Sequence, residues 1–126
     1  MTVLVAYNET AQGELALHAA LDECRRREEP LTVLVLTPQP DTAPTPPQLT
    51  ALSESSDVDI QIMFRSNAID VADAILDHAE QVHASMIVLG SRKRTPVGKF
   101  LLGSTTQRVL LDASVPVLVV KPPLEG

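Results

Sequence analysis

One stretch near the C-terminus constrains the fold more than any other part of this chain. It opens with the apolar run Met86–Leu89 and closes with the apolar run Val115–Val120. Short continuous apolar runs are typical of strands that are buried on both faces of a sheet. Between them lie three of the chain's five glycines and the helical spacing of Val109, Leu110 and Ala113. The stretch therefore predicts a strand, a loop that glycine makes flexible, a helix and a second strand.

The preceding part of the chain shows a similar alternation of strand and helix patterns. Apolar runs predict strands at Thr2–Tyr7, Leu31–Leu36 and Val58–Phe64, and helical spacing predicts helices at about residues 11–27 and 68–84. Five strands with interleaved helices indicate an α/β fold, a doubly wound sheet in a single domain over residues 1–126. Ligands of such sheets bind at the carboxyl ends of the strands, so the segments after Tyr7 and Leu89 are the expected site.

Residues 37–57 interrupt this alternation. They contain five of the ten prolines, together with serine, threonine and acidic residues. This composition predicts an exposed, partly extended connection with one or two helical turns around residues 48–54. A connection of this length is unusual in a compact domain, so we expect it to be mobile or functional.

Charge is distributed unevenly along the chain. Four of the ten basic residues, Arg92, Lys93, Arg94 and Lys99, lie in the loop after Leu89, which leaves six basic residues against sixteen acidic ones elsewhere. The net charge of −6 argues against general binding to nucleic acid or to an anionic membrane. The loop is therefore a local positive feature on an acidic protein.

Other features of the sequence point to a cytoplasmic protein without a metal centre. No apolar run approaches the length of a membrane helix, and the N-terminal residues lack the basic region of a secretory signal. The single cysteine, Cys24, excludes an internal disulfide and is expected to be a buried apolar residue. The histidines do not share a helical face with the spacing of a metal site, so we expect surface histidines.

The start of the last predicted helix has the features of a phosphate site. Gly103 is followed by Ser104, Thr105, Thr106 and Gln107, and Ser104 with Gln107 has the form of a capping box. A helix start offers free N–H groups and a partial positive charge, which favour anions. Glycines, hydroxyls, cations and a helix start together predict phosphate binding, the alternative being a solvated basic turn.

Known phosphate and redox motifs do not explain this loop. Gly98-Lys99 is followed by Phe100 where a P-loop needs a hydroxyl, and G-x-G-x-x-G is absent. A response-regulator receiver needs an aspartate after the third strand, where Arg65-Ser66-Asn67 stands. A flavodoxin-like carrier is excluded because the first turn carries an acid and flavin-stacking aromatics are missing.

The loop and the helix after it resemble the signature of the universal stress protein family. That signature is Gly, two residues, Gly, nine residues, Gly, then Ser or Thr, and Gly90, Lys93, Gly103 and Ser104 occupy its four positions. Lys93 stands where the family has glycine. The end of the chain, with Pro116–Val120, and its beginning are also similar to the family. The resemblance implies a five-stranded parallel sheet of order 3-2-1-4-5 with helices on both faces, and a shortened second helix.

The resemblance also implies an adenine nucleotide, ATP or AMP, with or without magnesium. The nucleotide-binding positions that it implies are Ala6, Asn8, Thr10, Leu36, Leu89, Gly90, Arg92, Lys93, Gly103, Ser104, Thr105 and Thr106. Asn8 replaces the family's usual aspartate, which keeps an acceptor oxygen but removes a charge. A lysine at position 93 either obstructs the approach of the phosphates or supplies a charge to them.

The resemblance finally implies a regulatory protein of the stress response that forms homodimers through its last strand. Val117, Leu118, Val119 and Val120 would supply that strand. Pairing with a second copy removes an exposed strand edge. No constellation of catalytic groups is identifiable, so we expect binding without enzymatic turnover or with slow ATP hydrolysis. The alternative is a dimeric family member that binds no nucleotide and acts as an interaction module.

Overall fold

The five strands form one parallel sheet in a computed structural model that describes residues 1–37, 45–91 and 102–121. The strands are β1 Thr2–Tyr7, β2 Leu31–Val35, β3 Ile60–Phe64, β4 Ala84–Gly90 and β5 Val117–Val120. Their order is β3-β2-β1-β4-β5, and each neighbouring pair is parallel. This arrangement confirms the doubly wound sheet and its implied strand order. The order reverses between β1 and β4, which places the switch point at the centre of the sheet.

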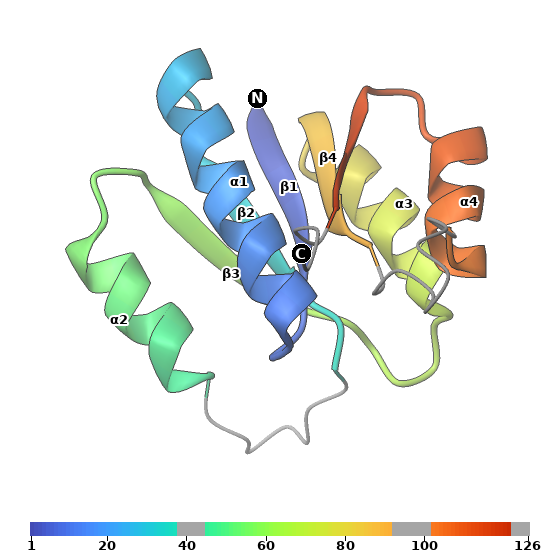
Figure 1. Ribbon diagram of the computed structural model, residues 1–126, viewed down its shortest axis with the longest axis horizontal. Helices are drawn as coiled ribbons and strands as arrows, with labels where there is room; N and C mark the ends of the chain where they lie inside the picture. Colours follow the sequence, from blue (N-terminus) through green and yellow to red (C-terminus); the bar gives the residue numbers. More distant parts are fainter. Residues whose placement is uncertain (38–44, 92–101, 122–126) are drawn as a thin grey trace, which may run out of the picture.

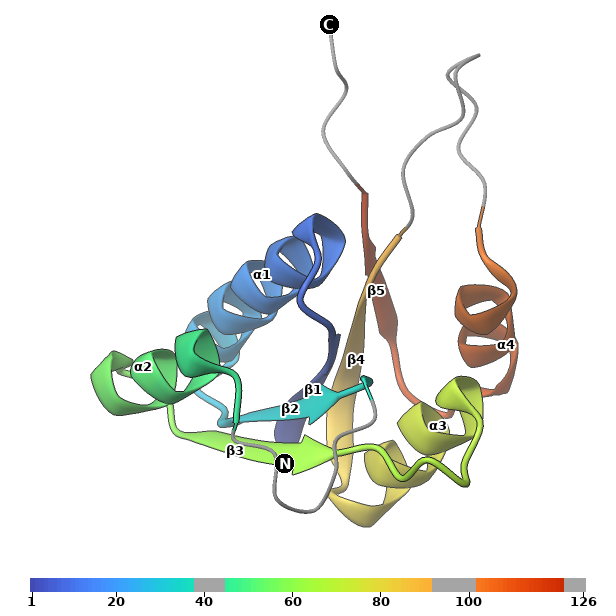
Figure 2. The same ribbon diagram turned by 90° about the horizontal axis from the view of Figure 1, so that it is seen from below.

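Within the residues that the structure describes, four helices cover the two faces of this sheet (Figure 1). They are α1 Ala11–Arg27, α2 Pro47–Ser55, α3 Val71–Gln81 and α4 Ser104–Asp112. The view from below shows α1 and α2 on one face and α3 and α4 on the other (Figure 2). Within the described residues, no helix has the length and apolar character needed to cross a membrane.

The sheet separates two apolar layers. All six residues of β1 are buried, and alternate side chains along this strand belong to opposite layers. Val3 and Val5 pack toward α1, whereas Leu4 and Ala6 pack toward α3 and α4. A central strand buried on both faces explains why its sequence is a continuous apolar run rather than an alternating one.

Helix α1 follows its sequence pattern closely. It begins after Thr10, whose Oγ1 caps the helix by accepting a hydrogen bond from the Gly13 amide at 3.1 Å. Its predicted apolar stripe, which includes Cys24, is buried against the sheet. Burial raises the pKa of the Cys24 thiol to about 11, as expected for an unreactive thiol in an apolar environment.

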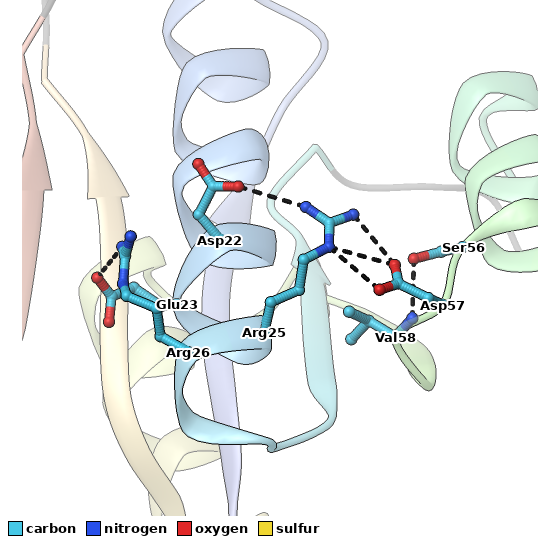
Figure 3. Close-up of polar contacts among 7 residues, drawn as sticks. All are labelled: Asp22, Glu23, Arg25, Arg26, Ser56, Asp57 and Val58. Atoms are coloured by element: carbon cyan, nitrogen blue, oxygen red, sulfur yellow. Dashed lines mark hydrogen bonds and ion pairs between the residues drawn. The ribbon is translucent and has the colours of Figure 1, made fainter.

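Helix α2 is longer than the one or two turns expected within residues 37–57. It has nine residues because its apolar face is anchored: Leu49 is 1% exposed and packs into the α1 layer. Gln48 Nε2 donates a hydrogen bond to the Tyr7 hydroxyl at 3.1 Å. The turn after α2 is held to α1 by an ion pair between Arg25 and Asp57 at 3.2 Å (Figure 3).

Helix α3 starts later and ends earlier than the predicted range of residues 68–84. Asp70 caps it by accepting a hydrogen bond from the Ala72 amide at 3.1 Å, so the helix begins at Val71. His83 has a left-handed backbone with φ of 54°. That conformation ends the helical register before β4, a boundary that apolar spacing does not reveal.

Candidate functional site

A cavity of about 380 Å³ lies at the carboxyl ends of the central strands. Its wall combines strand ends, the turn into α1 and the first turns of α3 and α4. The residues that line it are Ala6, Asn8, Gln12, Gly13, Leu36, Thr37, Arg65, Val71, Ile75, Leu89, Gly90, Gly103, Thr105 and Thr106. The cavity is therefore at the switch point, where ligands of doubly wound sheets bind.

Two glycines allow the backbone segments around the cavity to approach each other. A Cβ atom on Gly90 would lie 2.3 Å from the carbonyl oxygen of Gln12, and one on Gly13 would lie 2.0 Å from the carbonyl oxygen of Asn8. Such contacts are far inside van der Waals distance, so only glycine fits at either position. These approaches bring the end of β4 against the start of α1 and place Asn8 in the wall between them.

One part of the wall is apolar. Leu36, Val71, Ile75 and Leu89 lie in it, and they belong to or pack against the core layer on the α3 and α4 face. Ala6 lies beside them at the end of β1 and is 6% exposed. A wall of this kind suits the faces of a planar apolar group such as a nucleobase.

Another part of the wall is the start of α4. Gly103 is its N-cap, and no side chain caps this end. The predicted capping box is wrong, because Ser104 is already the first helical residue and Gln107 Nε2 donates instead to the Leu102 carbonyl at 3.0 Å. Among the residues that the structure describes, no side chain therefore accepts a hydrogen bond from the first-turn N–H groups. A helix end in this state favours an anion.

Helix α4 is tied to α3 beside the cavity. Arg108 forms ion pairs with Asp70 at 3.4 Å, with Asp112 at 3.5 Å and with Asp73. Asp70 is also the N-cap of α3, so this network joins the start of α3 to the second turn of α4. Each pair is exposed and weak by itself, but several bonds to one guanidinium limit the relative movement of the helices.

The Tyr7 side chain fixes the other side of the site. It is fully buried, and its hydroxyl donates to Glu14 Oε1 and accepts from Gln48 Nε2. Burial and the bond to the Glu14 carboxylate raise the pKa of Tyr7 to about 12. The Tyr7 carbonyl accepts from the Leu36 amide at 2.8 Å. These bonds connect β1, α1, α2 and the end of β2 immediately behind the cavity.

The cavity brings together eight of the twelve positions that the resemblance implied. They are Ala6, Asn8, Leu36, Leu89, Gly90, Gly103, Thr105 and Thr106. Thr10 and Ser104 are not among the lining residues: Thr10 caps α1, and Ser104 is exposed in the first turn of α4. Arg92 and Lys93 lie outside the residues that the structure describes.

Six lining residues were not predicted from the sequence. They are Gln12, Gly13, Thr37, Arg65, Val71 and Ile75. Gly13 carried a usable signal, because a glycine inside a helix costs about 1 kcal/mol relative to alanine and so indicates a close approach. Arg65 and Thr37 follow the carboxyl ends of strands, and ligands of doubly wound sheets bind at these ends. The sequence pattern of Val71 and Ile75 indicated only that they are core residues of a helix, not that they line a cavity.

The described residues contain no group of three or more His, Cys, Asp or Glu side chains that could hold a metal ion. A parallel sheet of order β3-β2-β1-β4-β5 with helices on both faces defines a doubly wound α/β domain, and the cavity lies at its switch point. The model of the universal stress protein family matches residues 1–121. The chain belongs to the universal stress protein family.

Individual relatives are similar over nearly the whole chain. A universal stress protein of Mycolicibacterium smegmatis is 30% identical and covers 95% of this chain and 97% of its own length. The structure of a universal stress protein from Archaeoglobus fulgidus has a TM-score of 0.76, with 27% identity and coverage of 96% and 98%. A universal stress protein from Archaeoglobus fulgidus in complex with dAMP has the same fold, with a TM-score of 0.68, 23% identity and coverage of 96% and 98%.

Proposed function

We propose that this chain is a regulatory stress-response protein that binds an adenine nucleotide, ATP or AMP, in the cavity at the switch point. The observation that carries the proposal is the combination, in one cavity, of an apolar wall with the uncapped start of α4. These two environments match the two chemical ends of a nucleotide, a base and its phosphates. A structural relative in complex with dAMP supports the choice of an adenine nucleotide.

In this proposal the base lies against Leu36 and Leu89, and Asn8 offers a hydrogen bond to the base or the ribose. The phosphates lie at the start of α4, where Gly103, Thr105 and Thr106 line the cavity. The further positions implied by the resemblance to the family, which complete the proposed site, are Ala6, Thr10, Gly90, Arg92, Lys93 and Ser104. Magnesium, where present, would arrive with the phosphates.

Calorimetric titration with ATP and magnesium, and with AMP, tests this proposal. We expect saturable binding to the unmodified protein. Gly103→Asp places a carboxylate at the start of α4, where it competes with the phosphates, so affinity is expected to fall at least about tenfold, equal to about 1.4 kcal/mol. Ser53→Asp adds the same charge to an exposed position of α2 and serves as the matched control.

The opposite outcome has a defined meaning. If neither nucleotide produces heat and none is released when the purified protein is denatured, the nucleotide proposal fails. The chain would then be a family member that acts as a dimeric interaction module. The proposal also excludes turnover at an ordinary enzyme rate, and phosphate release from bound ATP, measured in the same preparation, checks this point.

We also propose a cytoplasmic homodimer that pairs through β5. This strand is at the edge of the sheet, and all four of its residues, Val117–Val120, are half-buried. An apolar edge strand with unpaired N–H and C=O groups is stabilised by pairing with the same strand of a second copy. Light scattering at micromolar concentration is expected to give twice the 13.6 kDa mass of the chain, and a monomeric mass would contradict it.

A further inference from the structure

Arg65 is the one charged residue among the described residues that line the cavity. It follows β3 directly and is half-buried. Its Nε donates to the Leu36 carbonyl at 2.7 Å, and its Nη1 donates to the Ile69 carbonyl at 2.7 Å and to the Ser66 carbonyl at 3.4 Å. The guanidinium is therefore fixed by main-chain oxygens of two segments, one after β2 and one between β3 and α3.

These bonds leave part of the guanidinium unused. Nη2 makes no hydrogen bond within the described residues, and no described carboxylate pairs with Arg65. Arginine is always charged and carries five N–H donors in a rigid fork. A half-buried guanidinium that has no counter-ion in the described part of the chain, held beside a cavity, thus offers two free donors to a ligand in that cavity. It is pre-organised because little conformational freedom remains to be lost on binding.

Its position decides which part of a nucleotide it faces. Its Nε donates to the Leu36 carbonyl, and Val71 lines the cavity with it. Leu36 and Val71 belong to the apolar part of the wall, against which the proposed function places the base.

We propose that Arg65 Nη2 donates a hydrogen bond to a ring nitrogen of the bound purine base, which makes Arg65 a base-recognition residue of the cavity. The inference rests on the proposed nucleotide function and deepens it. A donor-only group at this position accepts a base that presents a lone pair and rejects one that presents a C–H or N–H there. Arg65 thus reads the base, while the start of α4 binds the phosphates.

Removing single acceptor atoms from the ligand tests the inference. ATP and its 1-deaza, 3-deaza and 7-deaza analogues, in each of which one ring nitrogen is a C–H group, are titrated into the unmodified protein and into Arg65→Gln. Comparing both partners in this way isolates the interaction between them. Arg25→Gln makes the same charge change in the last turn of α1, at the far end of that helix from the cavity, and is the matched control.

We expect one analogue to bind the unmodified protein at least about tenfold more weakly than ATP, the range of a hydrogen bond to a charged donor. Arg65→Gln should lose that difference, and Arg25→Gln should keep it. Arg65→Lys, which keeps the charge but loses the fork, should retain only part of it. Circular dichroism confirms that each variant is folded before titration.

Other outcomes overturn the inference in distinguishable ways. If Arg65→Gln weakens ATP and all three analogues by the same factor, Arg65 acts on the phosphates or by positioning Leu36 and Ile69. If Arg65→Gln binds every ligand like the unmodified protein, Arg65 does not contact the ligand. In both cases the nucleotide site itself stands. If the unmodified protein binds none of the four ligands, the proposed function fails and the inference fails with it.

Discussion

Replacing Ile75 with alanine is expected to lower the free energy of unfolding by about 2–5 kcal/mol. Ile75 is fully buried in α3 and belongs to the core layer on the α3 and α4 face, together with Leu4 and Ile87. Truncation removes apolar contacts and enlarges the cavity that Ile75 lines, so packing is lost without a replacement. Because the stability of a single domain is commonly 5–15 kcal/mol, this is a large part of the total.

Urea unfolding followed by circular dichroism measures this effect, and Leu111→Ala is its control. Leu111 is also an aliphatic residue on a helix of the same face, but it is 84% exposed, so its truncation should change stability by no more than about 0.5 kcal/mol. Equal effects of the two substitutions would contradict the burial of Ile75. Ile75→Ala should in addition weaken nucleotide binding, because the base loses part of its apolar wall.

Replacing Gly13 with alanine is expected to destabilise the protein by about 1–3 kcal/mol or more. Helix propensity alone predicts the opposite sign, because alanine in a helix is favoured over glycine by about 1 kcal/mol. The contact decides the result: the new methyl group would lie 2.0 Å from the Asn8 carbonyl oxygen and 2.6 Å from Asn8 Oδ1. The first turn of α1 or the turn after β1 must then move.

The same movement should displace Asn8 from the cavity wall, so Gly13→Ala is also expected to weaken nucleotide binding. Urea unfolding and calorimetric titration of one preparation report both effects. His18→Ala, at an exposed position of the same helix, isolates helix propensity and should be neutral or slightly stabilising. A stabilised Gly13→Ala variant would show that the close approach to Asn8 does not exist in solution.

Much of the fold was predictable because the spacing of apolar residues along the chain indicates which side of a helix or strand is buried. The continuous apolar run of β1 identified a strand covered on both faces, and helical spacing from Ala11 to Arg27 marked α1 with its observed bounds. The order of the strands came from resemblance to the family and not from spacing. Periodicity shows which face of an element is buried, but it does not show which element covers that face.

The bounds of an element were predicted less well where they depend on a single tertiary contact. α2 lies in a proline-rich segment with few apolar residues, and Leu49, buried against the α1 layer, anchors it there. The predicted capping box was wrong because it requires Ser104 to be the N-cap. In the structure the N-cap is Gly103, one residue earlier, and Ser104 is the first helical residue. Start signals are short and compete with one another, so tertiary contacts select among them.

For the candidate site, local sequence patterns showed that a glycine-containing loop and a helix start follow a buried strand, and these features indicated phosphate binding. The set of side chains that share the cavity became known only from the three-dimensional arrangement of the elements. Gln12 reaches it because Gly90 lets α1 and β4 touch, and Arg65 reaches it because parallel strands end at the same edge of the sheet. Chemical type and local periodicity are properties of neighbouring residues, whereas a cavity wall depends on strand order and close backbone contacts between distant segments.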